Sequence, residues 1–391
     1  MSKLNELIAQ LCPDGVEYIS LGDLFNTRNG YTPSKSKAEY WENGTIPWFR
    51  MEDIRENGRI LSDASQHVSV TAVKGSLFPE NSIIVATSAT IGEHALITVP
   101  SLANQRFTYL ILKEAYKDKF DIMFLYYYCF KLDSYCKECL NQGNFASVDM
   151  RKFVMFQFPI PPIEVQREIV RILDNFTELT AELTTELTTE LTARQQQYDY
   201  YRNDLLVFDD NVPVCRLEDI ADIGTGSSNT NEGLEEGEYP FFVRSPEVLR
   251  KNEYEFDETA IITAGDGVGV GKVFHYVDGK YALHQRAYRI HINAPNVLPR
   301  FFLHYMRATF VPYIQKNMYQ GAVASIRRPM LNAYPVPVPP VVEQKRIVNI
   351  LDRFDVVYND IMQGLPAEIE ARQKQYEYYR DKLLTFPEYS A

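Results

Sequence analysis

The sequence predicts an α+β protein with pseudo-two-fold symmetry, in which two α/β globules are separated by two long helices packed as an antiparallel coiled coil. The main observation behind this prediction is a repeat with an offset of 178 residues. Phe158–Phe176 returns as Val336–Phe354, and Ala193–Leu206 returns as Ala371–Leu384. The offset is the same in both places, so no residue is inserted or lost between them. A molecule built from two such copies is expected to bind something that also has two parts.

The repeat divides the 391 residues into five segments: a first globule (1–162), a central helix (163–206), a second globule (207–340), a C-terminal helix (341–384) and a tail (385–391). Pro-rich runs precede both helices. Proline lacks the amide hydrogen and cannot continue a helix, so each helix is expected to start abruptly. In the globules, short β-rich runs such as Ser82–Ala86 and Ala260–Thr263 alternate with Gly, Asn, Ser and Pro turns. Each globule is expected to close on a helix, Phe120–Cys139 and Pro299–Tyr319.

The central helix carries a Thr-Glu-Leu repeat in which leucine recurs at every fourth position. Steps of four advance about 40° around a helix, so four leucines form one apolar stripe about 120° wide. The C-terminal helix has aliphatic residues at the equivalent positions, and the two stripes are expected to pack on each other. The stripe residues are Leu179, Leu183, Leu187 and Leu191, with Val357, Ile361, Leu365 and Ile369. The alternative is that each helix packs only on its own globule.

A duplicated element that pairs with its twin is most simply antiparallel about a two-fold axis. The second helix has Gly364 and Pro366 where the first has Glu186 and Thr188, which predicts a bend or break there. Tyr-rich ends also recur, at residues 198–202 and 376–380. They could join the helices to the globules or dock a partner, and the first role is favoured.

Composition is typical of a soluble globular protein, with 45% hydrophobic and 24% charged residues. No apolar run is long enough to span a membrane and the start has no signal-peptide pattern, so we expect a cytoplasmic location without membrane contact. Five cysteines include one Cys-x-x-Cys, Cys136 and Cys139, without a second ligand pair. Free thiols are therefore expected rather than a metal site.

The net charge of −12 argues at first against a nucleic-acid partner. The charge is unevenly distributed, however. Residues 207–271 contain 4 basic and 15 acidic side chains, whereas residues 272–328 contain 9 basic and 1 acidic. This polarity predicts one basic face, because the local field governs phosphate binding more than the total charge does. The alternative is that folding mixes the two sets of charges.

Weaker similarities relate the globules to each other. Gln142–Ser147 matches Gln320–Ser325 at the same offset, and Asn104–Arg106 corresponds to His284–Arg286. Similar supports that carry dissimilar globules are what one protein needs in order to read two different half-sites.

Several motifs of the first globule resemble the target recognition domains of type I restriction-modification specificity subunits. They are Asn29–Ser34, Tyr40-Trp41, Ile46–Trp48, Ala89–Gly92 and Asn104-Gln105. The helices, with their Pro-Pro-Ile-x-x-Gln start and Thr-x-Glu-Leu repeats, resemble that family's conserved spacer regions. The resemblance covers essentially the whole chain. The second globule departs from it in its first loop, Gly224–Asn231, which lacks the Thr-Pro-Ser pattern.

No catalytic motif stands out. An adenine methyltransferase would carry Asp/Asn/Ser-Pro-Pro-aromatic, but Ile160 and Val338 precede the two Pro-Pro pairs here. The nearest P-loop candidate, Gly265–Val273, has Asp266 where a glycine belongs and Val273 in place of Ser or Thr. A Gly-rich turn, or a backbone approach to DNA phosphate, is expected there instead. We therefore expect a non-catalytic chain.

The resemblance implies a subunit that recognises a bipartite asymmetric site in double-stranded DNA. Partners would be methyltransferase (modification) subunits, expected in two copies, and restriction/translocase subunits. S-adenosylmethionine, ATP and Mg²⁺ would be bound by those partners and no cofactor by this chain. A related system with a fused methyltransferase-nuclease, and a coiled-coil scaffold that binds no DNA, remain alternatives.

Candidate DNA contacts are basic and amide side chains in or near the loops, because Arg, Asn and Gln read base edges and Lys and Arg hold phosphates. In the first globule they are Arg28, Ser34, Lys35, Asn104, Arg106, Asn144 and Arg151. In the second they are Ser228, Asn229, Lys272, His284, Arg286, Arg327 and Arg328. Arg106 and Arg286 share a repeated context and could serve the fold in both halves, which makes the unrepeated Arg327 the better candidate for reading sequence.

Overall fold

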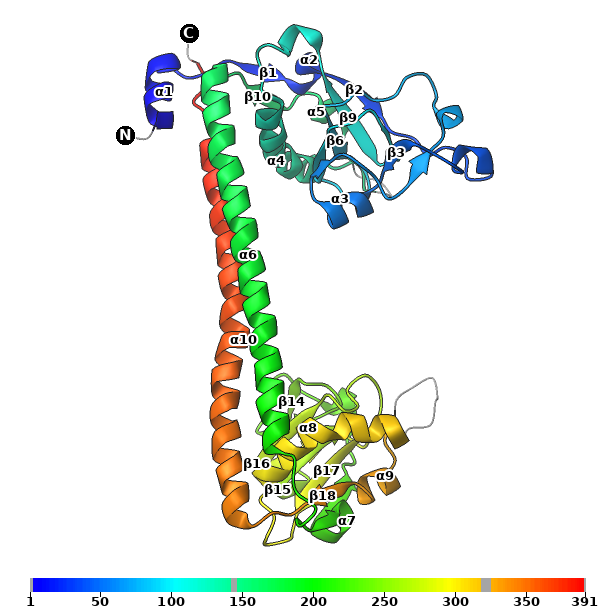
Figure 1. Cartoon of the computed structure of the whole chain (residues 1–391), viewed down its shortest axis with the longest axis vertical. Helices are drawn as coiled ribbons and strands as arrows, with labels where there is room; N and C mark the ends of the chain where they lie inside the picture. The colour runs from blue at the N-terminus through cyan, green and yellow to red at the C-terminus, as the bar shows by residue number, and fades with distance from the viewer. Residues whose placement is uncertain (1–2, 142–145, 318–324, 390–391) are drawn as a thin grey trace. The chain divides into compact units, whose positions relative to one another are not determined.

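A computed structural model describes residues 3–141, 146–317 and 325–389 (Figure 1). The chain forms two compact units, residues 1–184 with 369–391 and residues 185–368. Each unit contains one globule and one end of each long helix. Among the described residues, no helix combines the length and apolar character that crossing a membrane requires.

The first unit begins with α1 (Lys3–Leu11), and its globule contains three sheets. The five-stranded sheet has the order β2 (Phe25–Asn29), β9 (Phe107–Leu112), β6 (Ser82–Ala86), β7 (His94–Ile97), β4 (Ile60–Leu61). The three-stranded sheet has the order β5 (His67–Val68), β3 (Ile46–Phe49), β8 (Leu102–Ala103), and β1 (Tyr18–Ser20) pairs with β10 (Gln157–Pro159). The helices of this globule are α2 (Leu21–Leu24), α3 (Met51–Asn57), α4 (Ile122–Glu138) and α5 (Met150–Phe153), with single turns at Ala38–Tyr40, Val70–Ala72 and Glu114–Tyr116.

The second unit contains a six-stranded sheet. Its order is β12 (Ala221–Thr225), β17 (Ala287–Ile292), β15 (Phe256–Ala264), β16 (Phe274–Leu283), β13 (Tyr239–Phe242), β14 (Val248–Lys251). A separate pair joins β11 (Val214–Arg216) to β18 (Pro335–Pro337), and the helices are α7 (Leu217–Ile220), α8 (Pro299–Asn317) and α9 (Arg328–Asn332), with one turn at Thr230–Glu232. The Pro-rich runs before the long helices thus form β10 and β18, each in a two-stranded pair where a missing amide hydrogen is tolerated.

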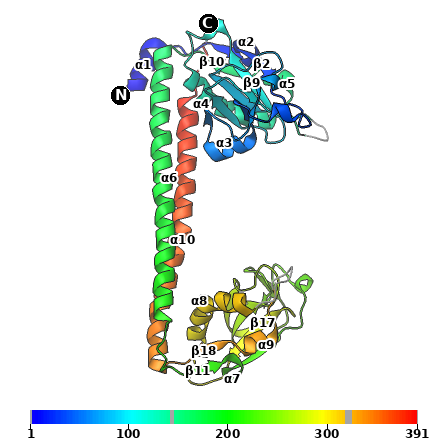
Figure 2. The same cartoon turned by 45° about the vertical axis from the view of Figure 1, so that its right-hand side comes forward.

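The long helices are α6 (Ile163–Leu205) and α10 (Val341–Leu383), each of 43 residues. In both views they lie side by side within each unit (Figures 1 and 2). In the second unit Tyr198 stacks on Tyr358, with ring centroids 4.5 Å apart, and Tyr201 contacts Phe354 at 6.0 Å. As the residue number increases along α6, the number of the contacting residue on α10 decreases. The predicted antiparallel pairing is therefore confirmed.

A completely buried glutamine fixes the start of each long helix. The Nε2 of Gln166 donates to the carbonyl oxygens of Pro161 (2.7 Å) and Lys119 (2.8 Å), and its Oε1 accepts from the N–H of Asp121 (2.9 Å). At the repeat offset, Gln344 makes the same three bonds in the second unit. Its partners are Pro339, Asn296 and Leu298, each at 2.8 Å.

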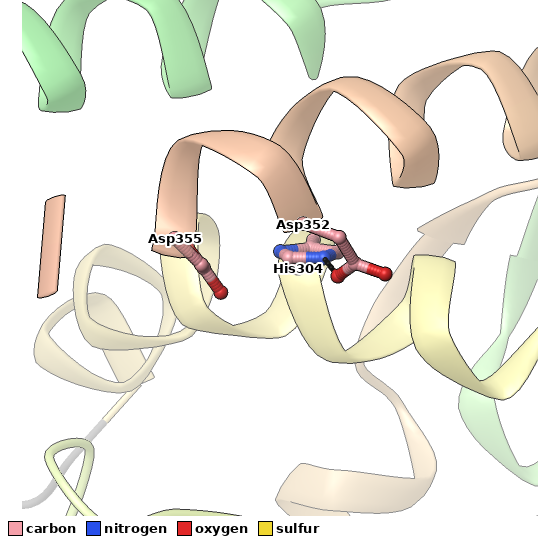
Figure 3. A group of neighbouring side chains, drawn as sticks. All are labelled: His304, Asp352 and Asp355. Carbon is pink, nitrogen blue, oxygen red and sulfur yellow. Dashed lines mark hydrogen bonds and ion pairs between the residues drawn. The ribbon is translucent and has the colours of Figure 1, made fainter. Parts of the chain in front are cut away.

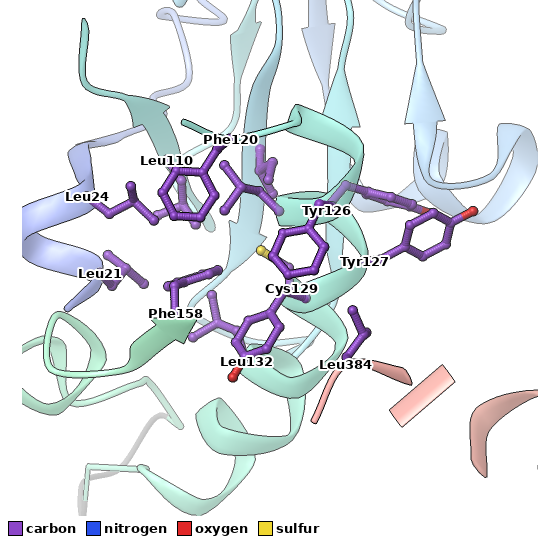
Figure 4. Close-up of a cluster of buried hydrophobic side chains, with 14 of the residues drawn as sticks. Leu21, Leu24, Leu110, Phe120, Tyr126, Tyr127, Cys129, Leu132, Phe158 and Leu384 are labelled. Atoms are coloured by element: carbon purple, nitrogen blue, oxygen red, sulfur yellow. The ribbon is translucent and has the colours of Figure 1, made fainter. Parts of the chain in front are cut away.

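The residues that directly follow each long helix pack on a globule core. Leu384 and Phe386, just after α10, join the core of the first globule, where Figure 4 shows Leu384 among side chains of α4 and the sheet. Their repeat equivalents Leu206 and Phe208 follow α6 and pack with Phe301 of the second globule. Each globule is therefore attached to the start of one helix and the end of the other.

The predicted stripe is only partly correct. Leu179 is 60% exposed and its equivalent Val357 57% exposed, whereas the other six stripe residues are half-buried. Thr180 and Thr184 are half-buried as well. The reason is geometric: a strict four-residue repeat drifts about 40° per step, so one end of the stripe leaves the seam between two packed helices.

Two further expectations need correction. A break at Gly364 and Pro366 is wrong, because α10 continues through both residues; a bend there stays a prediction. Packing of the Tyr-rich ends against the globules is wrong for four of the tyrosines, which are exposed: Tyr200, Tyr201, Tyr378 and Tyr379. Pro366 removes one hydrogen bond of the helix backbone, and α10 continues despite this loss.

Gly364→Ala is expected to stabilise the second unit by about 1 kcal/mol, because glycine inside a helix costs about that much relative to alanine. A Cβ at this position would meet no atom within 4 Å. Hydrogen–deuterium exchange of peptides from α10 measures the effect. Gly30→Ala is the opposite control, since its Cβ would lie 2.3 Å from the carbonyl oxygen of Asn104 and should destabilise the first globule. Faster exchange in Gly364→Ala would contradict the expectation.

Candidate nucleic-acid interface

Backbone hydrogen bonds draw several loops of the second globule together. The N–H of His284 donates to Phe242 (2.9 Å), that of Gly265 to Arg286 (2.9 Å) and that of Ile326 to Gly265 (2.8 Å). We call this assembly of loops the loop edge of the second globule. It comprises residues 226–229, 243–247, 265–273, 284–287 and 325–327.

The first globule builds a loop edge with the same backbone bonds. The N–H of Asn104 donates to Phe49 (3.0 Å), that of Thr87 to Arg106 (3.0 Å) and that of Val148 to Thr87 (2.9 Å). Six of the seven candidates of the second globule lie on its loop edge, and Asn104 and Arg106 take part in that of the first. Equivalent backbone positions carry different side chains in the two globules, such as Asn104 and His284.

The candidates of the second globule separate into buried and exposed groups. Ser228 and His284 are only 2% and 4% exposed, so they support the loops and leave direct contact with DNA to other side chains. Lys272 and Arg327 are exposed, and neither side chain forms a hydrogen bond or ion pair with another described residue. Arg328 is exposed but donates to the carbonyl oxygen of Ile223 at 2.5 Å. The remaining candidates interact within the edge: Asn229 with Gln285, and Arg286 with Asp266.

In the first globule, Lys35 and Arg106 are exposed, and their side chains have no such partner within the described ranges. Arg28 is used structurally, because it donates to Ser76 and stacks over the Phe78 ring at 4.3 Å. The other described candidates have local roles: Ser34 contacts Ser36, Asn104 accepts from the N–H of Arg106, and Arg151 pairs with Asp149. Asn144 lies outside the described residues.

Folding mixes part of the predicted charge polarity. Arg289 of the basic segment pairs with Asp222 (2.5 Å) and Glu258 (3.0 Å) of the acidic segment. Arg286 likewise pairs with Asp266 at 3.2 Å. For these two arginines the alternative holds, in which folding mixes the basic and acidic segments.

The Gly-rich segment Gly265–Val273 forms a loop, as the sequence suggests. Gly267 and Gly271 have φ values of +81° and +72°, a region that side chains with a Cβ rarely adopt. Asp266, which the sequence reveals only as a mismatch to a P-loop, binds both Arg286 and Arg244. Arg244 and Asp266 are the two residues of this edge that sequence reasoning missed.

No disulfide joins the five cysteines, and four of them are buried. Burial raises the pKa of Cys129, and it raises that of Cys136 to about 12. Among the described residues, none of the cysteines belongs to a group of ligand atoms close enough together to hold a metal ion.

Of the described residues, one group could hold a metal ion: His304, Asp352 and Asp355, whose ligand atoms lie within 4.8 Å of one another (Figure 3). Each carboxylate already has a guanidinium, since Arg300 lies 2.8 Å from Asp352 and Arg307 lies 3.2 Å from Asp355. A cation would enter beside two positive charges. The group is better described as an ion-pair network that ties α8 to α10.

Two divergent loop edges on a duplicated helical frame define a bipartite recognition protein. A family model of the type I restriction modification DNA specificity domain matches the chain twice, over residues 13–193 and 209–371. The chain belongs to this family.

Two relatives illustrate the match. The chain is 44% identical over 377 residues to the specificity subunit of the type I restriction enzyme EcoprrI from Escherichia coli, covering 92% of this chain and 93% of that protein. It is 34% identical over 294 residues to the EcoR124I/EcoR124II specificity subunit from Escherichia coli, covering 68% and 71%.

Solved structures share the fold. A chain from a study of complex assembly and conformational transition in the type I R-M system aligns with a TM-score of 0.76 at 15% identity, covering 96% of this chain and 98% of that chain. The HsdS subunit from Thermoanaerobacter tengcongensis aligns with a TM-score of 0.56 at 14% identity, covering 96% and 97%.

The second unit is expected to lose stability as the pH falls below about 6.5. Burial lowers the pKa of His275, His284 and His304 below that of an unfolded imidazole, about 6.5. Below this value the unfolded chain binds more protons than the folded one, so the stability these groups contribute is present above pH 6.5 and is lost under acid.

Hydrogen exchange of second-unit peptides between about pH 7.5 and 5.5, corrected for the intrinsic rate, measures this loss. His304→Gln should weaken the pH dependence. Tryptophan fluorescence serves as an internal comparison, because both tryptophans, Trp41 and Trp48, belong to the first globule. Equal stability of the second unit at both pH values would refute the expectation.

Proposed function

We propose that this chain is the DNA-recognition subunit of a type I restriction-modification complex. Each globule reads one half of a bipartite, asymmetric target, and the helix pair sets the spacer between the halves. The observation that carries the proposal is the pair of loop edges, which share backbone hydrogen bonds but differ in side chains: Asn104 against His284, and Ser88 against Asp266. Two unlike readers on one repeated frame suit two unlike half-sites.

In contact with double-stranded DNA, basic side chains would bind phosphates, and Arg, Asn and Gln side chains would form hydrogen bonds with base edges. Lys35, Arg106, Lys272 and Arg327 are the candidates best placed for this because they are exposed. The chain itself would be non-catalytic. Modification subunits would bind S-adenosylmethionine and methylate adenine, and restriction/translocase subunits would use ATP and Mg²⁺. In such a complex the protein acts in the cytoplasm.

Each unit has an apolar groove between α6 and α10. The groove of the first unit is lined by Phe176, Leu179, Thr180, Leu183, Arg372, Gln375, Tyr376 and Tyr379. The groove of the second unit is lined by Phe354, Val357, Tyr358, Ile361, Arg194, Gln197, Tyr198 and Tyr201. All eight positions correspond at the 178-residue offset. A groove that occurs twice favours two copies of one partner, and we assign it to an apolar helical face of the modification subunit.

Deleting one repeat unit, Thr184–Leu187, is expected to shorten the spacer in the recognised site by one or two base pairs. Four residues contribute about 6 Å of helix, and one base-pair step rises about 3.4 Å. Methylation mapping in cells that express the chain with its cognate modification subunit measures the result. Both half-sites should be unchanged. Thr184→Ala with Thr185→Ala keeps the helix length and should keep the spacer. An unaltered spacer in the deletion variant would contradict the proposal that the helix pair sets the spacer length.

Leu179→Glu and Val357→Glu are each expected to remove one of two bound modification subunits, because each places a charge in one groove. Both side chains are exposed in the chain alone, so folding should be little affected. Native mass spectrometry of the copurified complex reports the stoichiometry. Ala371→Glu and Ala193→Glu are matched controls, since both alanines are exposed on the same helices and line neither groove. Two partner copies on both single variants would exclude this docking site.

A further inference from the structure

Two arginines of the second globule meet on one carboxylate. Oδ1 of Asp266 accepts from Nη1 of Arg244 at 2.5 Å, and Oδ2 accepts from Nη1 of Arg286 at 3.2 Å. Burial alone would raise the pKa of Asp266, but the hydrogen bonds and charges of both arginines outweigh it and lower that pKa. The three side chains therefore form a cluster with one net positive charge at neutral pH.

The main chain fixes all three members of this cluster. Arg244 follows β13, Asp266 follows β15 and Arg286 precedes β17. The N–H of Gly265 donates to the carbonyl oxygen of Arg286 at 2.9 Å, which couples the second loop to the third. Underneath, the buried His284 accepts the N–H of Arg286 on its Nδ1 at 3.0 Å. Both arginines thus extend from backbone close to a strand of the sheet, and two hydrogen bonds hold the main chain of Arg286.

Most donors of the two guanidiniums remain available. The side chains of Arg244 and Arg286 are 39% and 62% exposed. A guanidinium has five N–H donors, and within the described part of the chain the only side-chain bond of each arginine is the one to Asp266. By contrast, Arg289 uses its donors on two carboxylates and is largely buried. The cluster therefore presents oriented donors to solvent at the loop edge.

We propose that Arg244 and Arg286 read guanine bases in the second half-site and that Asp266 is the positioning residue for both. This inference rests on the proposed function. Guanine offers O6 and N7 in the major groove, and the planar arginine fork can bond both at once. Holding the fork beforehand on a carboxylate reduces the side-chain entropy lost on binding. Lys272 and Arg327 are exposed on neighbouring loops, so both remain candidates for DNA contact beside the two arginines.

The first globule has no equivalent of this Arg–Asp–Arg cluster among its described residues. Ser88 occupies the position of Asp266, and Met51 occupies that of Arg244, counted from the equivalent strand-end residues Phe49 and Phe242. Arg106 corresponds to Arg286 but has no carboxylate bound to its side chain among the described residues. The cluster is thus specific to one globule and belongs to whatever distinguishes the second half-site from the first.

The test uses the full-length chain in complex with its cognate modification subunit. Methylation mapping defines the wild-type site, and binding is measured on duplexes in which each base pair of each half-site is replaced in turn. Arg244→Lys and Arg286→Lys should each lose about tenfold or more of the discrimination at a G·C pair of one and the same half-site. Asp266→Asn should relax both positions together. Because lysine keeps the charge, the salt dependence of the lysine variants should stay unchanged.

Arg216→Lys is the matched control. Arg216 also forms an exposed ion pair, with Glu218 at 2.9 Å, but lies outside the loop edge, so its variant should retain wild-type discrimination. Three results would overturn the inference: a second half-site without a G·C pair, unchanged discrimination in both lysine variants, or a uniform loss over all duplexes with a shallower salt slope. A wild-type complex that methylates no bipartite site would instead overturn the proposed function. If Asp266→Asn lowers folding, the lysine variants still decide.

Discussion

A buried joint connects each globule to a long helix and determines where that helix starts relative to the globule. At each joint a fully buried glutamine, Gln166 or Gln344, bonds three backbone groups of the loop before the helix and the loop before α4 or α8. Losing such a side chain would leave buried polar groups without partners, which is costly in a low-dielectric interior. The end of the other long helix then closes on the same globule through Leu384 or Leu206. Within each unit, the globule is thereby tied to both helices.

This frame explains how one duplicated chain can carry two different readers. The joints keep the same glutamine side chain in both units. The loop edges are held by backbone hydrogen bonds, which do not depend on the identity of most side chains. Ser88 can therefore stand where the other globule has Asp266, and Asn104 where it has His284, without a change in the backbone pattern. The two grooves differ much less than the loop edges do, because seven of the eight corresponding lining positions keep identical or similar residues and only Thr180 against Tyr358 does not. Divergent edges suit different half-sites, whereas similar grooves suit identical partners.

The amino-acid sequence predicted the helical frame better than it predicted the residues of the loop edges. The repeat and the periodicity of leucine placed both long helices and their antiparallel pairing, because these depend on local spacing and on symmetry. Periodicity gives the drift of the stripe around the helix but not which end leaves the seam, since the exposure of Leu179 and Val357 depends on where the partner helix lies. Composition could not show that Ser228 and His284 are buried. Composition also gave no sign that Arg244 and Asp266 form a pair. These two residues are 22 positions apart in the chain, and the folding of the sheet brings them together.

The duplication, the two long helices, the globules between them and the resemblance to a DNA-recognising family follow from the amino-acid sequence, because each is encoded in local residue order or in a constant offset. The folded structure was needed to show which polar side chains are exposed, which arginines share a carboxylate and which apolar residues line the grooves. These properties depend on contacts between segments far apart in the chain. Burial and pairing of charges are set by the packing of neighbours, and no spacing along the chain reports that packing.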